Sequence, residues 1–156
     1  MSQHFDTIIL GCGNAGFGVS SVLAGTGQQI AMVEAAEFGG VCPNRGCTPK
    51  KVLVAAATAM HEIERASIHT IDVSPPKLDW AKLIERKTGM IDFIPDAMRG
   101  VAEKRGQVFT GRARFVRAQE VDVNVERLTG DNLVIAIGST PRQLPTPGAG
   151  TRCRCR

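Results

Sequence analysis

The chain has 156 residues, of which 43% are hydrophobic and 22% are charged, and its formal net charge is +4. This length and composition suit one globular domain with a buried core, and no apolar run reaches the roughly 18 residues needed to span a membrane. Three of the four excess positive charges are arginines in the last eight residues, so the rest of the chain is near neutral, which argues against a nucleic-acid partner.

The first expected elements are a β-strand, an α-helix and a second β-strand. The segment that precedes them, residues 1–4, lacks a charged-then-apolar leader, so we expect a cytoplasmic protein, and free cysteines fit that compartment. Residues 6–10 form a short apolar run of strand type, residues 17–24 suit a helix packed on a sheet, and residues 30–34 form the second strand. This βαβ order predicts a parallel sheet.

Gly11-Cys12-Gly13-Asn14-Ala15-Gly16 stands between the first strand and the helix and matches a dinucleotide fingerprint. The first glycine permits a tight turn, the second lets the backbone approach a pyrophosphate, and the third lets helix and strand pack closely. N–H groups near Asn14 and Ala15 are expected to face the phosphates. Glu34, 18 residues after Gly16, is near the position of a carboxylate that binds ribose hydroxyls. The alternative for Glu34 is a solvated strand end.

Cys42 and Cys47 follow a Gly39-Gly40 turn and precede a helical stretch in which Lys50 and Lys51 come early. A thiolate at a helix N-terminus is stabilised by unpaired N–H groups and by the helix dipole, and nearby lysines add to that field. The pattern therefore indicates redox chemistry and predicts that Cys47 is the more acidic thiol.

The spacing of the two cysteines also constrains their local structure. Positions five apart on a regular helix have Cα atoms roughly 8.6 Å apart, whereas a disulfide tolerates at most about 7 Å. If the two cysteines bond, the segment between them must depart from a regular helix, which Pro43 and Gly46 permit. The alternatives are two buried apolar cysteines or half of a zinc site, but no second Cys/His cluster is present to complete a zinc site.

The middle of the chain is predicted to be helical. Apolar residues recur at helical spacing over residues 53–63, and His61 is expected on the surface. Pro75-Pro76 marks a turn, and Asp79 is expected to cap a second helix. Pro95 must interrupt that helix, so we expect an irregular join over residues 88–95 and a helix that resumes until residue 106.

The last third is predicted to consist of strands. We expect strands over residues 107–110, 113–116 and 121–125, then a turn at residues 129–132. Residues 133–137 form a continuous apolar run, which is typical of a strand buried on both faces of a parallel sheet.

Residues 39–51 resemble the redox motif of the class I pyridine-nucleotide disulfide oxidoreductases, flavoproteins that include glutathione reductase, dihydrolipoamide dehydrogenase, mycothione reductase and mercuric reductase. Their pattern is G-G-T-C-x-N-x-G-C-x-P-x-K, and only Val41 departs from it. Residues 111–115 resemble the family's G-x-A-x-F segment. Residues 136–141 resemble its A-T-G-S-x-P segment, with Ile137 in place of threonine.

The resemblance implies an α/β, Rossmann-like FAD-binding domain with a central parallel sheet and a small antiparallel β segment, incomplete relative to the family. It implies that electrons pass from NAD(P)H through FAD to a Cys42–Cys47 disulfide, that Cys42 then attacks a small-molecule or thiol-disulfide substrate, and that Cys47 stays against the flavin. A lysine would hold negative charge near the flavin, and backbone at Ala113 would meet its adenine. The expected cofactor-binding residues, with no metal ligand among them, are Gly11, Gly13, Asn14, Ala15, Gly16, Glu34, Gly40, Val41, Cys42, Lys50, Lys51, Ala113, Ala136 and Gly138.

The resemblance covers residues 4–148, and the tail, residues 149–156, is expected to be disordered. We therefore expect an N-terminal fragment without the family's NAD(P)H site and without the domain through which its members form homodimers, and we expect no turnover from it alone. The alternative is a non-catalytic nucleotide- or flavin-binding remnant. Metal handling by Cys153 and Cys155 is a third, less favoured interpretation.

Overall fold

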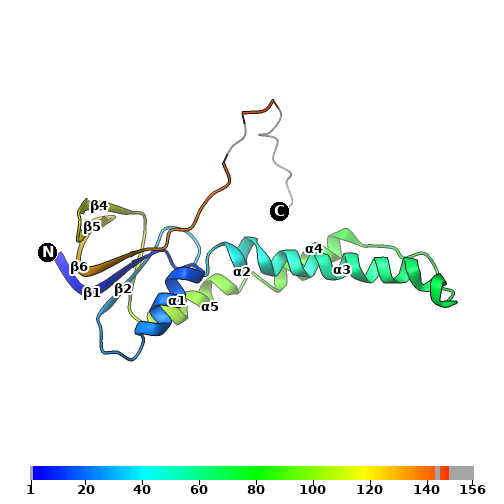
Figure 1. The fold of residues 1–156 in the computed structure, drawn as a ribbon, viewed down its shortest axis with the longest axis horizontal. Coiled ribbons are helices and arrows are strands. Elements are labelled where there is room, and N and C mark those ends of the chain that lie inside the picture. The colour runs from blue at the N-terminus through cyan, green and yellow to red at the C-terminus, as the bar shows by residue number, and fades with distance from the viewer. Residues whose placement is uncertain (1, 143–144, 148–156) are drawn as a thin grey trace.

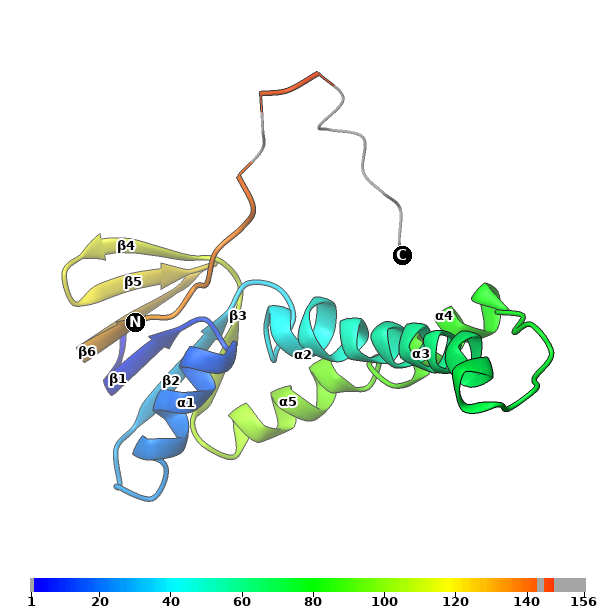
Figure 2. The same cartoon turned by 45° about the vertical axis from the view of Figure 1, so that its right-hand side comes forward.

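A computed structural model of the chain describes residues 2–142 and 145–147 (Figures 1 and 2). The tail expected to be disordered lies outside these residues. In chain order the elements are β1 (Ser2–Leu10), α1 (Asn14–Leu23), β2 (Ile30–Glu34), α2 (Val41–Arg45), α3 (Cys47–Arg65), the 3₁₀ helix η1 (Ala66–His69), α4 (Trp80–Gly89), α5 (Ile94–Glu103), β3 (Gln107–Thr110), β4 (Ala113–Arg117), β5 (Glu120–Val123) and β6 (Glu126–Ile135).

The strands form one six-stranded sheet in the order β3-β2-β1-β6-β5-β4. The first four strands in that order are parallel, and β5 and β4 are antiparallel additions. Leu10 at the end of β1 is opposite Val33 of β2 and Ile135 of β6. The carboxyl ends of the parallel strands therefore meet at one edge, where open α/β sheets bind their ligands. The expected mixed α/β, Rossmann-like fold is confirmed.

The core has two parts, one on each face of the sheet. On one face, α1 and α5 pack on the parallel strands (Figure 2), and the buried cluster there contains Ile9, Cys12, Phe17, Ile30, Met32, Phe38 and Ala102. The other cluster joins the parallel strands to the antiparallel ones, and its members are Phe5, Ile8, Leu10, Ala31, Val33, Phe109, Val121, Val123 and Leu128. The packing of these two clusters holds in place the ends of the strands beside the glycine loop.

The helices α3 and α4 run side by side and form an arm that extends away from the sheet (Figures 1 and 2). The helix expected over residues 53–63 lies within α3, and His61 is exposed as expected. Asp79 caps α4, since its Oδ1 atom accepts a hydrogen bond of 3.1 Å from the backbone N–H of Lys82. The chain leaves α4 after Gly89 and enters α5 at Ile94, so the expected irregular join is also confirmed.

The turn expected at residues 129–132 is wrong, because β6 runs through it without a break. The hairpin between β5 and β6 turns instead at Asn124 and Val125, where Asn124 adopts a left-handed φ of 55°. Gly130 serves a different purpose within the strand. A Cβ atom on it would lie 2.8 Å from Cγ1 of Ile8, so glycine allows β1 and β6 to approach closely.

The end of β6 differs from expectation as well. The strand stops at Ile135, and the side chains of Ile135 and Ile137 are 63% and 75% exposed rather than buried. Leu133 and Val134 still pack against the two core clusters on opposite faces, so the described residues cover the apolar run at its start but not at its end.

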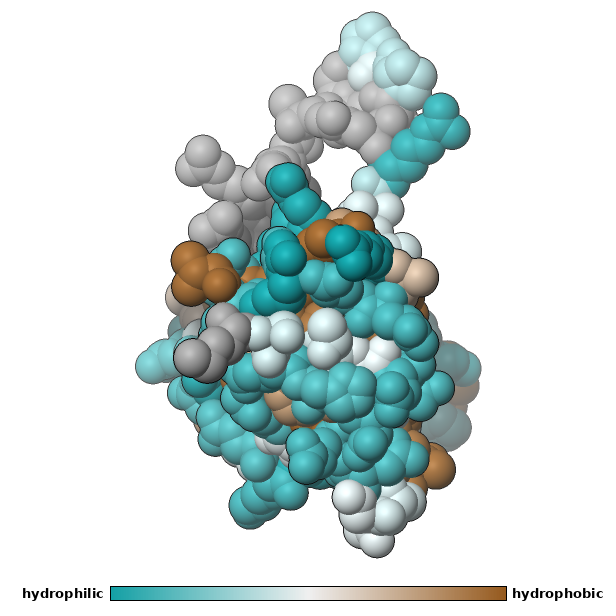
Figure 3. Space-filling view, turned by 90° about the vertical axis from the view of Figure 1, so that its left-hand side faces the viewer, coloured by the Kyte–Doolittle hydropathy of each residue, from teal (hydrophilic) through white to brown (hydrophobic). Residues whose placement is uncertain are grey.

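The surface is unevenly polar. The sheet end of the molecule is mostly hydrophilic, with separate hydrophobic residues (Figure 3). The arm and the loops around it carry more of the exposed large apolar side chains, including Val54, Ile68, Ile71, Trp80 and Phe93. Within residues 2–142 and 145–147, no helix is both long enough and apolar enough to cross a membrane.

Candidate functional site

The glycine loop between β1 and α1 is packed too closely for side chains. Gly11 has a φ of +105°, and a Cβ atom there would collide with the carbonyl oxygen of Ala136 just after β6. A Cβ atom on Gly16 would collide with the carbonyl oxygen of Gly11. Asn14, which follows Gly13, begins α1, and no side chain caps the first turn of that helix. Free N–H groups at a helix start that follows a glycine turn suit a phosphate group.

Glu34, the last residue of β2, turns its carboxylate toward this loop. Its Oε2 atom accepts a 2.8 Å hydrogen bond from the backbone N–H of Cys12, and its Oε1 atom accepts one of 2.9 Å from Ala36. Each carboxylate oxygen keeps acceptor capacity beyond these bonds. The acid expected to bind ribose hydroxyls is therefore held beside the glycine loop.

The loop that leads to the cysteines lies directly on the glycine loop. The backbone N–H of Gly39 donates a 2.8 Å hydrogen bond to the carbonyl oxygen of Cys12. Gly40 has a φ of +70°, and a Cβ atom on it would lie 2.8 Å from the Cα atom of Gly13. The sequence predicted each of the two motifs but not the contact between them. The pair Gly39-Gly40 was the signal that could have indicated this contact.

Cys42 and Cys47 lie on either side of a break in the helix. The helix α2 ends at Arg45, α3 begins at Cys47, and Gly46 between them has φ −121° and ψ −102°. A Cβ atom on Gly46 would lie 3.3 Å from the Cα atom of Cys42, so the two segments are closely packed. The segment between the cysteines thus departs from a regular helix, as a disulfide between them would require. Both thiols are free in this structure, with Cys42 half-buried and Cys47 exposed.

The acidity of the two thiols is the reverse of the expected order. A hydrogen bond from the Cys47 thiol lowers the pKa of Cys42, and the Asn14 side chain, the backbone of Cys47 and the charge of Lys51 lower it further. The same thiol–thiol hydrogen bond raises the pKa of Cys47, although Lys50 acts against that change. The sequence argument considered the helix start and the lysines but not the hydrogen bond between the two thiols, which has the largest effect on the pKa of each.

The remaining expected residues divide into two groups. The backbone N–H of Ala136 donates a 2.8 Å hydrogen bond to Leu10, so Ala136 lies beside the glycine loop. Ala113 begins β4, and nearby Gly111 donates a 2.8 Å hydrogen bond to the carbonyl oxygen of Glu34. The other group lies at the surface. Lys50 and Lys51 act there on the thiols through their charge, and the residues without further contacts that define a role are Ala15, Val41 and Gly138.

Asn44 is a residue of this site that the sequence analysis did not single out, although it is part of the motif. Its Nδ2 atom donates a 2.9 Å hydrogen bond to the carbonyl oxygen of Phe38, which fixes the segment between the cysteines to the chain that leaves β2. Its Oδ1 atom is buried and has no hydrogen-bond partner among the described residues. In the same segment, Arg45 forms an ion pair with Glu37.

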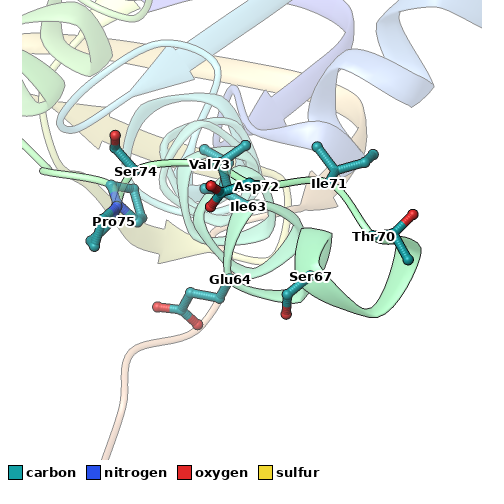
Figure 4. Close-up of a pocket in the computed structure, with 10 residues that line it drawn as sticks. Ile63, Glu64, Ser67, Thr70, Ile71, Asp72, Val73, Ser74 and Pro75 are labelled. Atoms are coloured by element: carbon teal, nitrogen blue, oxygen red, sulfur yellow. The ribbon is translucent and has the colours of Figure 1, made fainter.

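A hollow of about 680 Å³ at the far end of the arm is separate from this site. Its walls come from the end of α3 and from residues 67–76, and they include the carboxylates of Glu64 and Asp72 (Figure 4). None of the residues expected to bind a cofactor lines it. Among the described residues, no group of three His, Cys, Asp or Glu side chains is arranged to hold a metal ion.

Comparisons with known proteins show which proteins this chain resembles. The profile of the family described as pyridine nucleotide-disulphide oxidoreductase matches residues 5–156. A dihydrolipoyl dehydrogenase from Chlamydia muridarum is 30% identical over 149 residues, which cover 93% of this chain and 32% of that protein. One from Acholeplasma laidlawii is 31% identical over 150 residues, covering 95% and 45% of the two chains. A third, from Thermus scotoductus, is 33% identical over 143 residues, covering 91% and 31%.

One solved protein structure has a similar fold. The Cu(II) complex of the HOCl-induced flavoprotein disulfide reductase RclA from Escherichia coli superposes with a TM-score of 0.76 at 24% identity, over 94% of this chain and 31% of that one. The chain thus spans about a third of the length of the Chlamydia and Thermus relatives and of this structure, and 45% of the Acholeplasma relative.

Proposed function

The chain belongs to the pyridine nucleotide-disulphide oxidoreductase family, and on that premise we propose that it binds FAD and carries the redox-active pair Cys42–Cys47 of a disulfide oxidoreductase. The observation that carries the proposal is the contact between the glycine loop and the cysteine loop, through Gly13 and Gly40. A nucleotide bound by the first loop would lie next to the thiols of the second.

The residues present fit the adenosine diphosphate half of FAD. Gly11 and Gly16 leave no room for side chains, and the uncapped start of α1 offers N–H groups for the pyrophosphate. Glu34 offers acceptor oxygens for ribose hydroxyls at the end of β2. When bound, FAD supplies the two electrons that reduce a disulfide. Further contacts with FAD are proposed for Gly40, Val41, Ala113, Ala136 and Gly138.

The chemistry of the thiol pair is disulfide exchange. Two electrons and two protons convert the Cys42–Cys47 disulfide to two thiols. The Cys42 thiolate attacks one sulfur of a substrate disulfide, a Cys42–substrate bond forms, and the other substrate sulfur leaves as a thiolate. Cys47 then gives up its proton and attacks the Cys42 sulfur, which restores the Cys42–Cys47 bond and releases the second substrate thiol. The lowered pKa of Cys42 favours its role as the attacking group.

The two lysines near the start of α3 support this exchange. The charge of Lys51 lowers the pKa of Cys42, and that of Lys50 lowers the pKa of Cys47. Each thiolate therefore has a nearby cation while it carries negative charge. In this proposal Lys50 and Lys51 stabilise thiolates rather than bind substrate.

NAD(P)H is the proposed source of electrons, and a small-molecule or thiol disulfide is the proposed substrate class. The names of the three relatives, all dihydrolipoyl dehydrogenases, support a dithiol–disulfide substrate for the whole protein. Homodimer formation is proposed by analogy with the family. A non-catalytic flavin-binding remnant is less well supported, because the chain matches the oxidoreductase family and keeps both cysteines and both lysines of the motif.

Flavin binding is the experiment that tests this function. The purified chain is mixed with excess FAD, passed over a desalting column, and examined by visible absorption. We expect about one flavin per chain, and a Gly16→Val variant should retain none because a side chain there collides with Gly11. Gly18→Val on the same helix is the matched control, since a side chain at Gly18 meets no atom within 4 Å. A colourless wild-type chain that is folded by circular dichroism would contradict the proposal.

A further inference from the structure

The helix α2, which carries Cys42, is held in place by few contacts. It spans only Val41–Arg45, and none of its residues is buried. A helix this short is not stable by itself in water, so its position depends on contacts with the rest of the chain. Among the described residues, two side-chain contacts join it to the chain that leaves β2. Arg45 pairs with Glu37, and Asn44 donates a hydrogen bond to Phe38.

The two contacts differ in how firmly they anchor α2. The side chains of Arg45 and Glu37 are 56% and 50% exposed, and exposed ion pairs contribute little to stability. The Nδ2 atom of Asn44 donates a partly buried hydrogen bond of 2.9 Å to the carbonyl oxygen of Phe38. Phe38 is itself fixed, because its side chain lies in the core cluster and its neighbour Gly39 is hydrogen-bonded to the glycine loop. Asn44 therefore ties α2 to rigid backbone.

The restraint on α2 affects the two redox states of the cysteines unequally. In the disulfide state, the S–S bond itself restrains the segment between Cys42 and Cys47, because it holds the two residues at a narrow range of separations. In the dithiol state, which this structure describes, only non-covalent contacts such as that of Asn44 restrain it. Without the amide, the dithiol segment would gain conformational freedom that the disulfide segment cannot gain. Loss of the amide should therefore favour the dithiol.

We propose that Asn44 is a positioning residue whose amide holds the segment between Cys42 and Cys47 in place and thereby favours their disulfide over the two free thiols. This inference rests on the proposed function in taking the two cysteines as a redox pair, but it does not depend on FAD. The hydrogen bond to Phe38 belongs to the chain itself. Its effect is on the redox equilibrium of the pair.

The test measures this equilibrium in the flavin-free chain. The protein is equilibrated without oxygen in mixtures of glutathione and glutathione disulfide. In this exchange the dithiol gives up two electrons and two protons, and one glutathione disulfide becomes two glutathione molecules. Free thiols are then trapped by alkylation, and peptide mapping gives the oxidised fraction of Cys42 and Cys47. Asn44→Ala should lower the disulfide-to-dithiol ratio in a given mixture by about two- to tenfold, because the shift cannot exceed the net contribution of one hydrogen bond.

Two controls separate this effect from a general loss of stability. Asn132→Ala removes an amide that likewise donates to a backbone carbonyl oxygen, 3.1 Å away on Asp6, but it lies on β6. Glu37→Gln removes the exposed ion pair of α2. Both variants should leave the ratio unchanged. A second substitution, Asn44→Leu, keeps a side chain of similar size without the donor, and it should lower the ratio as Asn44→Ala does.

The proposal is overturned if Asn44→Ala or Asn44→Leu leaves the ratio unchanged, or if Asn132→Ala lowers it as much. A wild-type chain that forms no Cys42–Cys47 disulfide in any mixture would overturn the redox pair itself and this inference with it. Because no flavin is present, a chain that fails to bind FAD would contradict the proposed flavin site and leave the result for Asn44 in force.

Discussion

Gly40 lies so close to Gly13 that a Cβ atom on Gly40 would be 2.8 Å from the Gly13 Cα atom. Two motifs that are 27 positions apart in the sequence therefore share one backbone contact. Gly40 also has a φ of +70°, which residues with a side chain seldom adopt. Both features make glycine necessary at this point, where the chain passes from the nucleotide loop to the thiol pair.

Gly40→Ala should destabilise the fold and weaken FAD binding together. With φ 70° and ψ −158°, Gly40 occupies a backbone region that is essentially reserved for glycine, so alanine costs about 1–3 kcal/mol there, and the collision with Gly13 adds to that cost. Chemical denaturation and a flavin titration measure the two effects. Gly18→Ala on α1 is the matched control: a Cβ atom there meets nothing within 4 Å, so alanine should raise helix stability by about 0.5–1 kcal/mol. Equal stability of the two variants would contradict the contact.

Cys42 should be alkylated at lower pH than Cys47 in the reduced chain. The hydrogen bond from Cys47 lowers the pKa of Cys42 and raises that of Cys47. As the pH rises, Cys42 therefore reaches its reactive thiolate form first. Peptide mapping across a pH series gives the order directly. Exposure opposes this order, since Cys47 is the more accessible thiol, so the midpoint of each profile is compared rather than its maximum rate. Coincident midpoints would refute the assignment.

Cys12 should be unreactive in the native chain and should affect stability at high pH. Burial, followed by the charge of Glu34, raises the pKa of its thiol to about 12. The unfolded thiol loses its proton near pH 9 while the folded one keeps it, so the unfolded state binds fewer protons and stability falls as pH rises from about 9 to 12. Cys12→Ala should flatten that fall. Denaturation at a series of pH values measures the slope, and identical slopes would exclude the effect.

Glu34 should make the site select FAD over FMN, which lacks the adenosine half. Glu34→Gln removes the charge and should weaken FAD binding by about tenfold, because hydrogen bonds to charged groups are worth about 1.5–3 kcal/mol. Fluorescence titration with each flavin gives the affinities, and binding of FMN should not change. Glu37→Gln, which alters an exposed acid paired with Arg45, is the control. Equal wild-type affinity for both flavins would count against Glu34 as a ribose ligand.

Local motifs were sufficient to predict much of this fold. The glycine fingerprint, the Asp79 cap and the interruption before Pro95 each depend on backbone rules that act over a few residues, and each was found as expected. The expected turn at residues 129–132 failed because Gly130 resembles a turn residue in the sequence. Its actual constraint is the side chain of Ile8, on a strand more than a hundred residues away.

The site was predicted in parts rather than as a whole. The sequence identified both cysteines and the acid of β2, but not the hydrogen bond between the two thiols. That hydrogen bond joins residues on the two sides of the break at Gly46, and it lowers the pKa of Cys42 and raises that of Cys47. The contact between Gly13 and Gly40 was hidden because it joins two loops that are separate in sequence.

The central claim is that the flavin site and the Cys42–Cys47 pair form one functional unit. The most direct test is to load the chain with FAD and titrate it without oxygen with dithiothreitol while recording its visible spectrum. We predict that the first two electrons per chain reduce the Cys42–Cys47 disulfide and alter the flavin spectrum without bleaching it, and that Cys47→Ser abolishes this change. A bound flavin whose spectrum is unchanged while peptide mapping shows both thiols reduced would contradict the claim.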